Sequence, residues 1–167
     1  MVPEGPGKGH MTNVRALNFR SDMNAAAYEY WCGLTDGDRL PGRRHIDPSD
    51  MLPFLPYVML MDVIREPELD FRYRLIGTKH QSFWLKNLTG VCIRATEQQG
   101  PGSTIWKGLE RAATTAMPMS TRAPYVGTKK EIYEIEDILM PLAEDGRTVD
   151  MIFVCCDYLT KPVYIKR

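Results

Sequence analysis

Two neighbouring segments, residues 57–66 and 70–77, alternate apolar and polar side chains in the pattern of half-buried β-strands. Pro67-Glu68-Leu69 separates them, so we predict that they form a β-hairpin. One face of this hairpin is apolar throughout and is expected to lie against the core: Tyr57, Met59, Met61, Val63, Phe71, Tyr73 and Leu75. The opposite face mixes charged and apolar residues, so we expect it to be partly exposed to solvent.

The C-terminal half of the chain predicts three further strands. Residues 133–142 and 148–158 flank Asp145-Gly146, a strong signal for a two-residue hairpin turn. Residues 119–126 form a less regular strand, and Pro124 within it suits the edge of a sheet. The turn would place three apolar pairs on one face: Leu142 with Val149, Met140 with Met151, and Ile138 with Phe153.

Helical segments precede and separate these hairpins. Ser21 or Asp22 is suited to cap a helix that ends at Gly33, and Ser103 is suited to cap another over residues 104–117. A short helix is predicted over residues 78–85. The order is then one helix, two strands, a run of helices and three strands. This order predicts an α+β domain built on an antiparallel sheet.

Composition narrows the class of protein. The 167 residues suit one domain, and a hydrophobic content of 44% allows a sizeable core. Lys plus Arg and Asp plus Glu number 21 each, so net charge gives no reason to expect binding to nucleic acid or an anionic membrane. The sequence lacks an apolar run near the ~20 residues that span a bilayer and lacks an export signal. We therefore expect a cytoplasmic protein.

The expected domain covers residues 21–160, with a C-terminal tail at 161–167. Residues 1–20 are expected to be a disordered segment or a tag remnant, because their first half is rich in Gly and Pro. The four cysteines match neither a zinc site nor a redox pair, so we expect reduced thiols.

A series of short motifs runs through the expected domain after Trp31: Leu40-Pro41, Ile46-Asp47-Pro48, Leu60-x-Asp62-Val63, Phe71-Arg72-Tyr73-Arg74-Leu75-Ile76-Gly77-Thr78, Leu88-Thr89-Gly90, Met140-Pro141-Leu142 and Asp145-Gly146-Arg147. Together with the element order, these motifs resemble a PAS-like family of short bacterial proteins, widespread in alphaproteobacteria. The resemblance implies the PAS fold, with five antiparallel strands, helices between the second and third strands, and an N-terminal helix on the outer face of the sheet. It also implies signal sensing and partner binding, and this functional inference rests on analogy of fold.

The sequence offers little support for catalysis, a metal or a cofactor. His45 and His80 are both expected at the surface, and neither a nucleophile elbow nor a phosphate-binding loop occurs. No two His or Cys residues lie at the spacing of zinc ligands. The helix over 104–117 lacks the His that would ligate haem, and the residues around Cys92 differ from the flavin-binding motif of photosensory PAS domains. We expect no catalytic residues, no metal and no cofactor.

A small-molecule pocket is one interpretation of the Met and aromatic residues expected between the sheet and the helices. The alternative is a filled core. The candidate pocket residues are Met59, Met61, Tyr73, Trp84, Cys92, Trp106, Met140, Met151 and Phe153.

A second candidate site is an interface on the outer face of the sheet. Four apolar residues of the last hairpin are expected to point away from the core, where the N-terminal helix or a second subunit covers them. A homodimer is therefore expected. Asp62 and Arg74 should form a cross-strand ion pair if Glu66 pairs with Asp70. The candidate interface residues are Tyr28, Trp31, Asp62, Arg74, Ile135, Leu139, Ile152 and Val154.

The sequence thus favours a non-catalytic, stand-alone sensory or signalling module whose partner is an unidentified small molecule or a signalling protein. A ligand-free interaction adaptor is the alternative within the same fold. A small-molecule enzyme in an α+β cup would need a pair of polar residues in the pocket, and Tyr73 alone is a plausible titratable lining residue.

Overall fold

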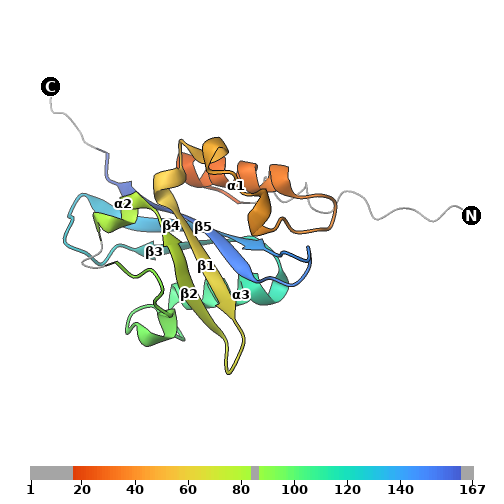
Figure 1. Cartoon of the computed structure of the whole chain (residues 1–167). Helices are drawn as coiled ribbons and strands as arrows, with labels where there is room; N and C mark the ends of the chain where they lie inside the picture. The colour runs from red at the N-terminus through yellow and green to blue at the C-terminus, as the bar shows by residue number, and fades with distance from the viewer. Residues whose placement is uncertain (1–16, 84–86, 163–167) are drawn as a thin grey trace, which may run out of the picture.

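A five-stranded antiparallel sheet with the order β2-β1-β5-β4-β3 forms the centre of the protein (Figure 1). The computed structural model describes residues 17–83 and 87–162. The first two strands are joined by a short hairpin, whereas the helical segments α2 and α3 separate β2 from β3. The strands are β1 Val58–Ile64, β2 Asp70–Ile76, β3 Met119–Pro124, β4 Ile132–Leu142 and β5 Met151–Thr160. The α+β PAS fold expected from the sequence is confirmed.

The helices begin where the sequence places capping residues. The Ser21 hydroxyl accepts a hydrogen bond from the Asn24 N–H at the start of α1, and the Ser103 hydroxyl accepts one from the Trp106 N–H at the start of α3. Ala116, with φ of 56°, ends α3 in the left-handed conformation. The helices are α1 Asp22–Leu34, α2 Thr78–Gln81 and α3 Thr104–Thr115, and short 3-10 turns span Arg43–His45, Pro48–Met51, Leu55–Tyr57 and Ile93–Ala95. No helix in the described ranges is long and apolar enough to cross a membrane.

The two long helices cover opposite faces of the sheet (Figure 1). Helix α1 packs on β4 and β5, where the Phe153 ring lies 6.4 Å from the Tyr30 ring. Helix α3 packs on the other face, where the Trp106 ring lies 5.3 Å from the Phe71 ring. We call these the α1 face and the α3 face. Side chains alternate between them along each strand, so Cys155 lies on the α1 face and Cys156 on the α3 face.

The last hairpin differs from the expected turn. Leu142 pairs with Met151 rather than with Val149, and residues 143–150 form a longer connection. This connection is tied to the segment after α1, because the Leu40 N–H donates to the Gly146 carbonyl at 2.9 Å. The Asp145 carboxylate also accepts hydrogen bonds from the N–H groups of Arg147 and Thr148, which opens the turn. The shift of two residues keeps each side chain on the same face as its expected partner.

The apolar strip assigned to the outer face is on the α3 face instead. Gly108 of α3 approaches β4 so closely that a Cβ there would lie 2.7 Å from a Leu139 methyl carbon. Helix α3 therefore covers Ile135, Leu139, Ile152 and Val154, whereas α1 covers the alternate residues Ile138, Met140, Phe153 and Cys155. The expectation that α1 or a second subunit covers the first set is wrong. Tyr28 and Trp31 are buried within the chain, 3% and 1% exposed, and are unavailable to a partner.

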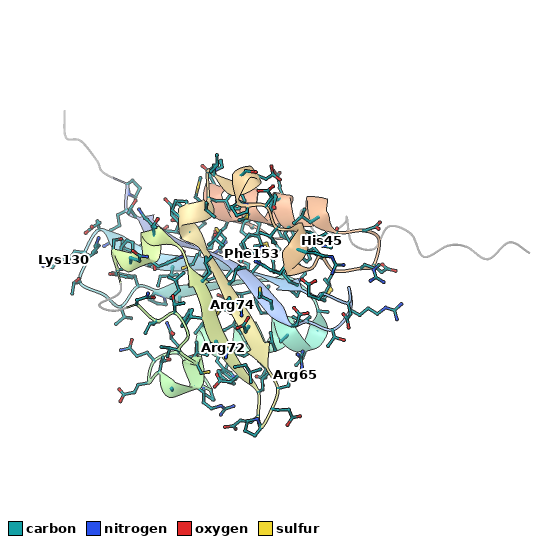
Figure 2. All side chains as sticks on the ribbon, viewed as in Figure 1. His45, Arg65, Arg72, Arg74, Lys130 and Phe153 are labelled. Carbon is teal, nitrogen blue, oxygen red and sulfur yellow. The ribbon has the colours of Figure 1, made fainter. Side chains whose placement is uncertain are left out.

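The first hairpin is also shifted by two residues. Ile64 pairs with Asp70 and Asp62 with Arg72, and a β-bulge follows at Leu60 and Met61. Asp62 accordingly lies 2.9 Å from the Arg72 guanidinium and 3.7 Å from that of Arg74. The predicted pair between Asp62 and Arg74 is present, but Arg72 is the nearer partner. Figure 2 shows both arginines on this hairpin, away from α1.

A close backbone approach at Gly77 leads to a test of the junction between the hairpin and α2. The Gly77 N–H donates to the Val58 carbonyl, and a Cβ at residue 77 would lie 2.7 Å from that oxygen and still closer to the Pro56 carbonyl. Gly77→Ala should therefore lower the free energy of unfolding in urea by about 1–3 kcal/mol or more. Gly33→Ala is the control, because a Cβ on that helical residue meets no atom within 4 Å. It should be neutral or stabilising, and equal losses in the two variants would contradict the account.

Candidate functional site

The α3 face carries a buried polar cluster within an otherwise apolar surface. Asp137 on β4 is 8% exposed and sits directly across from Cys156 on β5. The Thr121 hydroxyl of β3 donates to the Asp137 carboxylate at 3.3 Å. Neighbouring positions on these strands, Leu139 and Val154, are fully buried and apolar. The carboxyl group therefore lies inside the core rather than at its rim.

Burial sets the protonation of this cluster. It raises the pKa of Asp137 to about 6, although hydrogen bonds with Cys156 and Thr121 act in the opposite direction. Burial also raises the pKa of the Cys156 thiol, and the adjacent Asp137 carboxylate raises it further. The thiol is thus neutral at physiological pH, whereas the carboxyl group changes charge close to it. A neutral, buried thiol is a poor nucleophile.

Tyr73 of β2 provides a second polar group on the same face. Its hydroxyl donates to the Gln99 side-chain oxygen at 2.7 Å, in the segment that precedes α3. Burial raises the pKa of Tyr73, so its hydroxyl remains protonated. Trp106 adds an aromatic side chain on this side of the sheet, and the Arg94 guanidinium lies 4.9 Å from the centre of its ring. The cluster can exchange hydrogen bonds with a polar molecule, but it lacks an activated nucleophile.

The predicted pocket residues do not assemble into one site. Met59, Met61, Tyr73 and Trp106 lie on the α3 face. Cys92 is half-buried at the edge of the sheet, where its backbone forms an isolated β-bridge with Arg72. Trp84 lies outside the described residues. Met140, Met151 and Phe153 lie on the α1 face. The cause is the pairing of β1 with β5, in which Met61 lies opposite Ile152 and Asp62 lies opposite Met151. Met59 and Met61 therefore lie on the other face of the sheet from Met140 and Met151.

Sequence reasoning missed the residues that make the cluster polar. Asp137, Cys156, Thr121 and Gln99 were not among the candidates, although the alternation of β4 contained a signal. Asp137 occupies the same face as Ile135 and Leu139, so it is a carboxyl group in an apolar series. The face of that series was assigned incorrectly, which hid the significance of Asp137.

His80 is buried rather than exposed as expected. Its ring nitrogens lie 2.9 Å from the Tyr158 hydroxyl and 3.0 Å from the Tyr57 carbonyl oxygen. Burial lowers the pKa of His80, which favours the neutral ring. His45 is exposed as expected, and its Nδ1 accepts a hydrogen bond from the Gly42 N–H. In the described ranges, no three potential metal-ligating side chains group together.

Glu136, the neighbour of Asp137, lies on the α1 face with its side chain fully buried. Its carboxylate accepts hydrogen bonds from the backbone N–H groups of Arg20 and Ser21, from Asn24 and from Arg122, at 2.9–3.2 Å. Burial alone would raise the pKa of Glu136, but these donors hold it below the usual value. Two adjacent carboxyl groups on β4 thus have pKa values shifted in opposite directions.

A comparison with protein-family models agrees with this architecture. A family model described as a PAS domain matches residues 19–156. The chain is also similar to the solved structure of a sensory box sensor histidine kinase from Vibrio cholerae, with a TM-score of 0.48 and 16% sequence identity. That similarity covers 68% of this chain and 90% of the other. No curated protein matches the sequence.

The raised pKa of Asp137 predicts an unusual dependence of stability on pH. The folded state favours the protonated carboxyl group. The stability that Asp137 contributes is therefore fully present below the unfolded-state pKa of 3.8 and is lost as pH rises through about 6. Asp137→Asn removes the ionisation. Its stability relative to the unmodified protein should therefore rise by about 2–3 kcal/mol between pH 4 and pH 7 in urea unfolding.

The matched control is Glu110→Gln, which replaces an exposed carboxyl group of α3 by an amide. Its stability curve should follow that of the unmodified protein. Parallel curves for Asp137→Asn and the unmodified protein across this pH range would show that Asp137 is not protonated in the folded core.

Proposed function

This chain belongs to the PAS domain family, and from that premise we propose that it is a non-catalytic sensory module that binds a small molecule on the α3 face of its sheet and acts on a signalling partner in trans. The polar cluster around Asp137 and Tyr73 is the proposed recognition site. The four cysteines are free, which supports a reducing, cytoplasmic setting.

The observation that carries the proposal is the buried carboxyl group of Asp137. Burial of a carboxyl group costs free energy unless it is compensated, and apolar residues of similar size commonly give equal or greater stability. The Cys156 thiol is a weak hydrogen-bond donor and the Thr121 hydroxyl lies at 3.3 Å, so together they compensate the burial of the carboxyl group only weakly. Departures of this kind from good core packing are expected at functional sites. A polar ligand would supply the stronger partners.

The arrangement of β4 suggests how binding would reach the opposite side of the domain. A ligand that changes the charge or hydrogen bonds of Asp137 acts on the backbone next to Glu136. Glu136 holds the start of α1 through the N–H groups of Arg20 and Ser21. A small shift of the strand would then alter the position of α1. This coupling belongs to the proposal and requires a ligand with different affinities for the two arrangements.

The same residues argue against catalysis. The Cys156 thiol and the Tyr73 hydroxyl both remain protonated, because burial raises their pKa values. His80 contacts Tyr158 and Tyr57. A nucleophile next to a general base and an orienting acid, which acyl-transfer chemistry requires, is not found among the described residues.

A protein partner remains part of the proposal, and the outer side of the first hairpin is its candidate surface. Arg72 and Arg74 share the Asp62 carboxylate there, and their side chains are 45% and 63% exposed. Helix α1 covers β4 and β5 instead, so this surface remains accessible in the chain. Helix α3 covers the apolar strip from which we expected a homodimer, so this strip no longer supports dimer formation.

Native mass spectrometry of freshly purified protein tests the ligand. We expect a non-covalent adduct above the 19.1 kDa chain that is released on denaturation. Asp137→Asn and Tyr73→Phe should each reduce its occupancy several-fold, because the first replaces the ionisable carboxyl group by an amide and the second removes the hydroxyl group.

Glu110→Gln on the exposed side of α3 is the control and should retain the adduct. An adduct that persists in both cluster variants would place the ligand elsewhere. If the unmodified protein carries no adduct, the ligand-free adaptor is favoured over the sensory module.

A further inference from the structure

An open cavity of about 570 Å³ lies at the end of β5, where that strand meets α2 and the connection between β3 and β4. In Figure 2, Lys130 marks this connection at the edge of the molecule. The cavity shares no lining residue with the cluster around Asp137. Its lining includes aromatic and charged residues: Tyr57, Lys79, Phe83, Lys129, Glu131 and Tyr158.

Aromatic rings form one wall of the cavity. The rings of Phe83 and Tyr158 stack with centroids 3.9 Å apart and an interplanar angle of 17°. Tyr125 meets both rings edge-on, with its centroid 6.3 Å from each. Tyr57 adds another ring to the lining. This wall offers apolar contact area that is already held in place by its own packing.

Two ammonium groups approach this wall. The Lys129 Nζ lies 4.3 Å from the centre of the Phe83 ring, and the Lys79 Nζ lies 6.0 Å from it. Lys79 is also 5.6 Å from the Tyr57 ring. Neither lysine forms an ion pair with any residue in the described part of the chain. Both ammonium groups therefore lie within 6.0 Å of the centre of the Phe83 ring.

The other charges in the cavity are largely satisfied. Arg20 lies 2.7 Å from the Glu134 carboxylate. Asp157 accepts hydrogen bonds from the Ser21 hydroxyl at 2.7 Å and from the Tyr158 N–H at 2.8 Å. Glu131 contributes one further negative charge to the lining. Hydrogen bonds from these neutral donors do not cancel the charge of Asp157, so the lining carries three positive and two negative side chains. The two ammonium groups beside the Phe83 ring favour an anion at that position, whereas Glu131 and Asp157 disfavour a second negative charge on it.

We propose that this cavity binds a small aromatic monocarboxylate. The carboxylate contacts the ammonium groups of Lys79 and Lys129, and the ring packs on the aromatic wall beside Tyr57 and Phe83. The volume is within the range that accommodates small organic ligands. The site is independent of the proposed sensory cluster, because the two are lined by different residues.

Titration of ¹⁵N-labelled protein with benzoate, followed by amide chemical shifts, tests this site. Saturable shifts should appear at Phe83, Ile132 and Thr160, all of which line the cavity. Acetate has the charge without the ring, and benzamide has the ring without the charge, so each should bind at least about tenfold more weakly. Phthalate, which carries two charges, should bind no better than benzoate.

The variants Lys79→Gln and Lys129→Gln should each weaken benzoate binding about fivefold. Lys107→Gln, on the exposed side of α3, should leave it unchanged. Well-dispersed amide spectra establish that each variant is folded. The proposal would be overturned by equal affinity for benzamide, by shifts confined to the α3 face, or by no saturable shift at millimolar benzoate. Because these outcomes concern another cavity, they leave the sensory cluster unaffected.

Discussion

The buried carboxylate of Glu136 is the interaction on which the placement of α1 on the sheet depends. Its donors come from the start of α1, from Asn24 within that helix and from Arg122 on β3. A charged group without solvent is tolerated only when its hydrogen bonds are made by the fold itself. Glu136 therefore fixes the point at which α1 begins on the sheet, and α1 then covers Phe153 and Cys155.

Asp137 is subject to the opposite constraint, although it is the next residue on the strand. Strand alternation turns its side chain to the α3 face, where few donors are available and burial favours the neutral form. One strand thus holds an ionised group toward α1 and a titratable group toward α3. Pairs of titratable groups whose environments shift their pKa values apart are typical of functional sites in which the two groups have different roles. The opposite shifts of these two pKa values are the physical basis on which we connect the proposed recognition site to the helix.

The sequence predicted the fold well because its signals were local. Ser21 and Ser103 cap the two long helices as expected, and all five strands occur near their predicted bounds. The candidate site was predicted less well because it depends on a non-local pairing. The register of β1 against β5 decides whether Met61 shares a face with Ile152 or with Phe153, and no turn signal specifies it. Three of the four residues that donate to Glu136 likewise lie more than 100 residues away along the chain: Arg20, Ser21 and Asn24.

The central claim is that Glu136 and Asp137 titrate at different pH values inside the same folded domain. Side-chain carboxyl ¹³C chemical shifts, followed by NMR as pH is lowered from 8 to 3, measure this directly. We predict that Asp137 titrates near pH 6, while Glu136 remains ionised below the usual range of a glutamate. If both carbons titrate together at ordinary values, the two carboxyl groups are equivalent, and the account of a titratable group toward α3 opposite an ionised anchor toward α1 is wrong.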